Sequence, residues 1–240
     1  SFSLNRLNYH FTTADEPVIR FLGLFLDPHL SFKYHIAKVV SKIAKGMYII
    51  RTVKNILPES AQKTLYFSLI NSHLIYALPA YGCAENSVLK PLVKIQKKAI
   101  RIISKSKWNS HCQPIFKRLG ILRFEDMVKY SQLEFMYFWE HKRLPASFLD
   151  TWKRKNDFMG PDNYSLRNAL DLYTETPRLT FSQRLPLFKF PVLWNTLEPE
   201  IKQTWPPFLF KKLVKCQLLV KLAEEINCEN PYCPDCFSAT

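Results

Sequence analysis

The stretch Phe21-Leu22-Gly23-Leu24-Phe25-Leu26-Asp27 decides the fold, together with the Ser31-Phe32-Lys33 that follows it. An apolar run with one internal Gly is typical of a strand, so residues 18 to 26 are predicted to pair with residues 7 to 12 as a β-hairpin. From Ser31 onward, where a helix cap is expected, the apolar residues recur with a helical period. The sequence therefore predicts a hairpin that leads into a helical bundle.

The predicted fold is mainly α, with an irregular C-terminal segment after the bundle. The division that we expect is a hairpin over residues 1–30, a helical region over 31–150 and a C-terminal segment over 151–240. Within the last part, residues 181 to 194 look extended and Phe208 to Ile226 form a terminal helix. The bundle itself is predicted to hold about five helices, namely Ser31 to Asn55, Pro58 to Tyr81, Ser87 to Lys105, Cys112 to Leu119 with Gly120 as its end, and Glu125 to Lys142.

The chain is strongly basic. Lys and Arg outnumber Asp and Glu by 34 to 20, which gives a formal net charge of +14. Such an excess indicates a partner that carries phosphates or an anionic membrane surface. The apolar helix faces are needed for the core and no apolar run approaches the roughly 20 residues that span a bilayer, so we expect no membrane partner. The chain opens without Met or a signal pattern, and we expect the intracellular tail of a longer protein.

The basic residues are concentrated on two predicted helices. Six of them fall within an arc of about 100° on the helix from Ser87 to Lys105. No Asp or Glu occurs between Asn86 and Arg123, whereas an ordinary solvated helix mixes both signs; a solvated outer face is the competing interpretation. A second row lies on the first helix, and the two rows are expected to line a groove that binds phosphates. The predicted nucleic-acid-binding residues are Lys38, Lys42, Lys45, Lys90, Lys94, Lys97, Lys98, Arg101 and Lys105.

No set of residues predicts a catalytic centre. The sequence contains no Asp-Asp pair to hold two metal ions and no Gly-rich phosphate loop. Four aromatic residues near the basic rows are candidates for stacking on bases, with a place in the core as the alternative for each ring. They are Tyr48, Tyr66, Trp108 and Phe116.

The C-terminal tail contains three closely spaced cysteines. Cys233 and Cys236 are separated by two residues, the spacing of a tetrahedral zinc site, and Cys228 is the expected third ligand. A fourth ligand is missing, because no His follows His141. The tail therefore predicts a zinc site with an incomplete ligand set, and the alternative is a Cys-rich tail without metal.

Several motifs, in this order and spacing, resemble the reverse transcriptases of non-LTR (LINE-type) retrotransposons of the jockey and chicken-repeat kind. The resemblance extends along nearly the whole chain. The motifs that carry it include Phe21-Leu22-Gly23, Ser31-Phe32-Lys33-Tyr34-His35-Ile36, Leu57-Pro58, Ile95-Gln96-Lys97-Lys98-Ala99-Ile100-Arg101, Pro114-Ile115-Phe116-Lys117 and Pro191-x-Leu193-Trp194-Asn195.

This resemblance implies the C-terminal part of an RNA-directed DNA polymerase, with a primer-grip hairpin, a thumb and a C-terminal segment. It implies that Phe21, Leu22 and Gly23 support the primer end, and that the basic rows hold the RNA template and an RNA–DNA hybrid or DNA primer during target-primed reverse transcription. The Mg²⁺-binding palm and the fingers would lie upstream in the same polyprotein, so this chain alone is expected to be inactive. A nuclear ribonucleoprotein is the expected location. The alternative is a non-enzymatic RNA-binding or scaffold module derived from a retroelement fragment.

Overall fold

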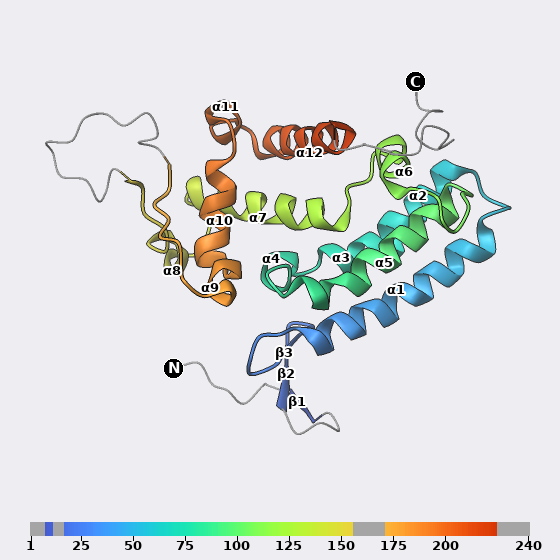
Figure 1. Ribbon diagram of the computed structural model, residues 1–240, viewed down its shortest axis with the longest axis horizontal. Helices are drawn as coiled ribbons and strands as arrows, with labels where there is room; N and C mark the ends of the chain where they lie inside the picture. Colours follow the sequence, from blue (N-terminus) through green and yellow to red (C-terminus); the bar gives the residue numbers. More distant parts are fainter. Residues whose placement is uncertain (1–7, 12–16, 156–170, 225–240) are drawn as a thin grey trace, which may run out of the picture. The chain divides into compact units, whose positions relative to one another are not determined.

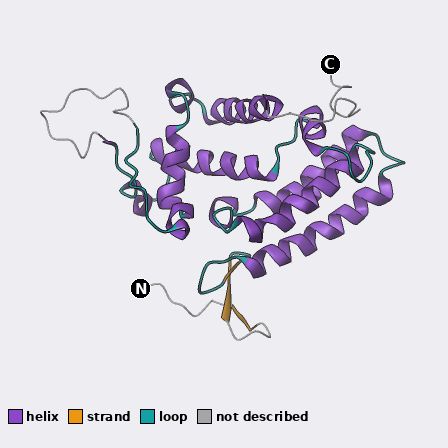
Figure 2. Cartoon of the chain, viewed as in Figure 1, coloured by secondary structure: helices purple, strands orange, loops and turns teal. Residues whose placement is uncertain are grey.

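The computed structural model describes residues 8–11, 17–155 and 171–224, and most of these residues are helical (Figure 1, Figure 2). The predicted fold class is thereby confirmed. The chain divides into two compact units. The first unit comprises Ser1–Glu125 and Leu219–Thr240, and the second unit is Asp126–Leu218. The predicted three-part division at residues 30 and 150 stays a prediction.

Three short antiparallel strands open the first unit, in the spatial order β1 (Asn8–Phe11), β2 (Pro17–Phe21) and β3 (Leu24–Leu26). Phe21 pairs with Leu24, so only Leu22 and Gly23 connect β2 to β3. Both residues have a positive φ, 46° at Leu22 and 85° at Gly23, as the tightest hairpin turn requires. The predicted strand over residues 18 to 26 is therefore two strands, and the turn was missed because Leu gives no turn signal.

The helices of the first unit are α1 (Lys33–Val53), α2 (Glu59–Tyr66), the π-helical turn η2 (Phe67–Asn71), α3 (Ser72–Ile75), α4 (Leu78–Tyr81), α5 (Asn86–Ile103) and α6 (Cys112–Leu119). The predicted end of α6 is confirmed, because Gly120 has a φ of 62°. The single helix predicted from Pro58 to Tyr81 is interrupted, first by η2 and then at Ala77, which has a φ of 56°.

The π-helical turn lies against α1 at Gly46. A Cβ atom on Gly46 would be only 2.9 Å from the carbonyl oxygen of Leu69 in η2. Gly46 is therefore the residue that permits the close approach of the two backbones.

Asp27 organises the entry into α1. Its carboxylate accepts the backbone N–H groups of Ser31 at 2.8 Å and Phe32 at 2.9 Å. Burial raises the pKa of Asp27, but the bonds from Ser31 and Phe32 outweigh burial and the pKa is lowered overall. Helix α1 begins at Lys33 with Phe32 in the N-cap position, one residue after the predicted cap Ser31, and the Ser31 Oγ accepts the backbone N–H of Lys33 at 3.4 Å.

Gln96 joins three segments of the first unit from a fully buried position in α5. Its Nε2 donates to the hydroxyl of Tyr66 at 2.9 Å and to the carbonyl oxygen of Leu122 at 3.0 Å. Its Oε1 accepts the backbone N–H of Phe124 at 2.8 Å. Each helix face has a fixed direction, so an inward Gln96 also fixes which side of α5 points outward.

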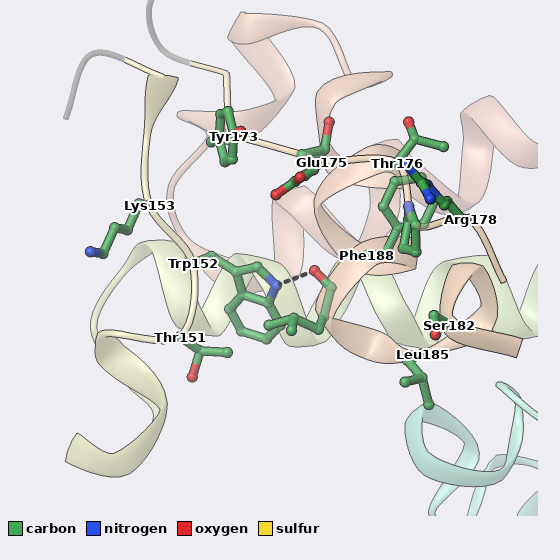
Figure 3. A pocket seen from close by; sticks show the side chains of 13 residues that line it. Thr151, Trp152, Lys153, Tyr173, Glu175, Thr176, Arg178, Ser182, Leu185 and Phe188 are labelled. Carbon is green, nitrogen blue, oxygen red and sulfur yellow. Dashed lines mark hydrogen bonds between the residues drawn. The ribbon is translucent and has the colours of Figure 1, made fainter. Parts of the chain in front are cut away.

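From residue 124 onward the described helices are α7 (Phe124–Glu140), α8 (Ala146–Leu149), α9 (Thr180–Arg184), α10 (Pro186–Asn195), α11 (Pro199–Lys202) and α12 (Pro207–Glu224). The prediction that residues 181 to 194 are extended is therefore wrong. Pro191 has no N–H to donate to the carbonyl of Leu187, four residues earlier. Figure 3 shows the replacement: Trp152 Nε1 donates to that carbonyl at 3.0 Å. Pro186 stands at the first position of α10, where Pro is favourable.

Replacing Gln96 with Leu should destabilise the first unit. The substitution removes the hydrogen bonds to Tyr66, Leu122 and Phe124, and each buried group left unpaired costs about 1–3 kcal/mol. Urea denaturation should show a lower midpoint, with an unchanged dependence of the free energy of unfolding on urea concentration. A Gln203→Leu control at an exposed position should match the wild type. An unchanged midpoint in Gln96→Leu would contradict the central role of this side chain.

His35 is buried at the start of α1. The backbone N–H of Phe25 donates to its Nδ1 at 3.5 Å, and its ring centroid lies 5.1 Å from that of Tyr81. Its Nε2 has no hydrogen-bond partner among the described residues. Burial, and to a lesser degree the positive charge of Lys42, lower the pKa of His35 to about 4.

The lowered pKa of His35 predicts a loss of stability in mild acid. Between pH 6.5 and about 4 the unfolded chain binds a proton at His35 that the folded chain does not. The free energy of unfolding should therefore fall as the pH drops through this window and level off near its lower end. Thermal melts of wild type and His35→Gln across this pH range test the prediction, since the stability of the variant should fall less steeply as the pH drops. Equal slopes would contradict it. Asp27, with its lowered pKa, acts only at still lower pH.

Candidate nucleic-acid interface

The outward face of α5 carries a row of basic side chains. Five of the six predicted residues are exposed, including Lys105 just after the helix. Arg101 is half-buried, and its Nε donates to the carbonyl oxygen of Ser110 at 3.0 Å. The opposite face packs into the core, where Leu92, Ala99 and Ile100 are 0% exposed. None of the lysines in this row forms an ion pair with another described residue. The row is therefore a cationic surface whose charge the described residues do not neutralise.

A pocket of about 480 Å³, the basic pocket, lies where the C-terminal ends of α1 and α5 meet. The two helices pack side by side and run in the same direction (Figure 1). Arg51 and Lys54 were missed by sequence reasoning, because only the packing of α1 against α5 brings them to this pocket. The lining residues come from the ends of both helices and from the loop after α5: Arg51, Lys54, Lys98, Arg101, Ile102, Lys105, Ser106, Trp108 and Asn109.

The predicted row on α1 faces elsewhere. At 100° per residue, Lys38, Lys42 and Lys45 lie roughly 150° around α1 from Arg51. The structure therefore brings Arg51 and Lys54, rather than this row, to the pocket with α5. The row begins near the start of α1, where Lys38 Nζ is 5.1 Å from the ring centroid of Tyr34, and that ring lies 5.1 Å from the ring of Phe25 in β3. Nucleic-acid contact by this row stays a prediction.

The predicted primer-grip residues form the exposed tip of the β2–β3 hairpin. Phe21 is 52% and Leu22 is 76% exposed. Tyr76 steadies the tip, because its hydroxyl donates to the carbonyl oxygen of Leu22. A Cβ on Gly23 would lie 3.7 Å from the ring of Tyr76, an ordinary contact, so the positive φ rather than lack of space calls for Gly here. Sequence reasoning gave Tyr76 no role; an aromatic residue at the end of α3 was the available signal.

The four aromatic candidates for base stacking divide into two pairs. Tyr66 and Phe116 are 0% and 1% exposed and belong to the core, so the stacking hypothesis is wrong for them. Burial also raises the pKa of Tyr66. Tyr48 and Trp108 are 71% and 86% exposed. Only this second pair has ring faces that an unpaired base could reach.

A larger pocket, of about 670 Å³, lies in the second unit (Figure 3). Its walls include the rings of Trp152 and Phe188, and its charged lining residues are Lys153, Glu175 and Arg178. Acidic and basic groups are mixed there, so this pocket lacks the uniform positive charge of the basic pocket.

The described residues hold no group of three or more His, Cys, Asp or Glu side chains that could bind a metal ion. Cys228, Cys233 and Cys236 lie outside the described residues, so the zinc site stays a prediction. No described helix is both long enough and apolar enough to cross a membrane.

Lys105 lines the basic pocket in a strained backbone conformation. It follows α5 with a φ of 53°, and the next residue, Ser106, donates its N–H to the carbonyl oxygen of Arg101 at 3.1 Å. This is the position after a helix where Gly is usual. A left-handed conformation costs a residue with a Cβ roughly 1–2 kcal/mol. A charged side chain at the pocket thus occupies a position where Gly would relieve the strain.

Replacing Lys105 with Gly should raise the free energy of unfolding by about 1 kcal/mol, because Gly adopts the left-handed conformation without the Cβ clash. Urea or thermal denaturation measures the change. Lys105→Gln removes the charge but keeps the strain, and it should show no gain. A Gly variant no more stable than the Gln variant would contradict the assignment of strain.

Two curated proteins of Drosophila melanogaster are similar to this chain. The RNA-directed DNA polymerase from mobile element jockey is 28% identical over 114 residues, which are 46% of this chain and 12% of that protein. The probable RNA-directed DNA polymerase from transposon X-element is 24% identical over 163 residues, which are 66% of this chain and 17% of that protein. The chain thus spans less than a fifth of either relative. No protein-family model and no solved structure matches it. The resemblance carried by the sequence motifs is confirmed, because the chain is similar to two proteins named as RNA-directed DNA polymerases of Drosophila mobile elements.

Proposed function

We propose that this chain is the part of a retrotransposon RNA-directed DNA polymerase that grips nucleic acid. It holds the RNA template and the primer during target-primed reverse transcription. The chemistry belongs to an upstream palm with its Mg²⁺ ions, as the sequence resemblance implies. Both relatives are named as RNA-directed DNA polymerases, which supports a partner made of RNA or DNA.

The row of basic residues on α5 is the observation that carries this proposal. Lysines that repel one another along one helix face are unfavourable without an anionic partner, since each like-charged pair one turn apart costs roughly 0.2–0.5 kcal/mol. Phosphates of a nucleic-acid backbone neutralise such a row without regard to base sequence. An RNA–DNA hybrid suits the role, because side chains recognise A-form duplexes through backbone and shape.

The hairpin tip supports the primer side of the proposal. Leu22 and Gly23 form a tight turn. Its tip at Leu22 is exposed, and the Tyr76 hydroxyl donates a hydrogen bond to the carbonyl oxygen of Leu22. A turn fixed in this way presents backbone groups at a defined position. In the proposed function, this tip supports the primer end while the row on α5 holds the duplex.

The test is the binding of the full chain to a labelled RNA–DNA hybrid, followed by fluorescence anisotropy across a salt series. We compare wild type with a triple variant, Lys90→Gln, Lys94→Gln and Lys98→Gln. Each lost phosphate contact should flatten the plot of log affinity against log salt concentration by roughly 0.7–0.9. The triple variant should therefore bind more weakly and show a slope lower by about two.

A matched control removes the same charge elsewhere, at the exposed residues Lys117, Lys212 and Lys221. This control should keep most of the wild-type slope. Equal losses in both triple variants would show that net charge alone drives binding, and they would overturn the proposed role of α5. A third variant with Gln at Lys38, Lys42 and Lys45 tests the row on α1 in the same assay.

A further inference from the structure

The basic pocket shares Lys98, Arg101 and Lys105 with the row on α5 but differs from the rest of the row in what it offers a ligand. The row presents charge alone on the outward face of a helix. The pocket is a concave site of about 480 Å³ with five cations and no carboxylate among its lining residues. It also contains one large aromatic ring, that of Trp108.

Trp108 is presented to solvent by a loop that is held in place. Its side chain is 86% exposed, although a Trp ring is usually among the most buried side chains. The loop that carries it is closed by the N–H of Ser110, which donates to the carbonyl oxygen of Lys107 at 3.1 Å. The carbonyl of Ser110 is in turn fixed by Arg101 at 3.0 Å. The exposed ring thus stands on a fixed support beside the cations of the pocket.

We propose that the basic pocket binds a single-stranded segment of nucleic acid, with an unpaired base stacked on Trp108 and the adjoining phosphates held by Arg51, Lys54 and Lys98. Cations that follow a backbone, combined with an aromatic platform, are the arrangement that binds single strands. In a duplex the base faces are covered by their neighbours, so the ring of Trp108 finds no partner along the length of a hybrid. This inference rests on the proposed function, and it assigns to the pocket the unpaired strand next to the hybrid.

The strained Lys105 fits the same assignment. Its left-handed φ places a third flexible ammonium group at the pocket, beside those of Lys54 and Lys98, at a position where Gly would relieve strain. Strained backbone positions of this kind cluster at binding sites.

The experiment measures binding of the full chain to an unstructured oligo(U) and an oligo(dT) of about 12 nucleotides. A strand of equal length with abasic sites in place of bases carries the same number of phosphates. Trp108→Ala should weaken binding to the base-bearing strands by roughly 5- to 150-fold, and Trp108→Phe should recover most of that loss. The variant should bind the abasic strand and the RNA–DNA hybrid as the wild type does. A preference for oligo(U) over oligo(dT) would identify the strand as RNA, and the reverse would identify it as DNA.

Unchanged binding of Trp108→Ala to the base-bearing strands would overturn the proposal, as would an equal loss on the abasic strand. Trp108 is exposed, so its replacement should leave the fold intact, and a thermal melt checks this. The outcome is separate from the test of α5. Loss of hybrid binding only in the variant at Lys90, Lys94 and Lys98, without any effect of Trp108→Ala, would retain the grip on the duplex and reject the single-strand site.

Discussion

The set of hydrogen bonds made by Gln96 is the constraint on which the rest of the first unit depends. Donor and acceptor atoms of one buried amide are satisfied by Tyr66 from α2 and by two backbone groups near the start of α7. A buried amide tolerates little rotation of its helix, because rotating α5 about its axis would leave these groups unpaired in the core. The orientation of the basic row is therefore determined from inside the protein, by a neutral side chain on the opposite face.

The cations that line the basic pocket interact favourably with the partial negative charges of two helix ends. It forms where two parallel helices end, and each helix C-terminus carries roughly half a negative charge. The two ends together offset about one of the five cations that line the pocket. The remaining positive charge exceeds what the two helix ends can neutralise, which is why we propose a phosphate-bearing ligand for the pocket.

Much of this architecture could be predicted from the sequence, and the failures have definable physical causes. The amphipathic helices α1, α5, α6 and α7 were predicted within a few residues, because their apolar residues recur with a helical period. The turn at Leu22 was missed since its geometry depends on Gly23 and on support from Tyr76. Helix α10 was missed because its continuation through Pro191 depends on a tertiary contact: the indole of Trp152 satisfies the carbonyl that Pro191 leaves unpaired. For the site, the row on α5 could be read from helical spacing alone. Arg51 and Lys54 could not, because their neighbours across the pocket are set by tertiary packing.

The π-helical turn η2 sets how the residues after it are rotated relative to α2. A π turn accommodates one residue more than the α-helix around it, and such turns often occur at functional sites. The wider turn takes up the extra residue without rotating the helix that follows. If the same residues formed a regular α-helix instead, everything after Asn71 would be rotated by about 100°, and Tyr76 would point away from the hairpin tip that it now holds. The extra residue in η2 therefore determines the direction in which Tyr76 points. Through Tyr76 it supports a turn more than forty residues earlier in the chain.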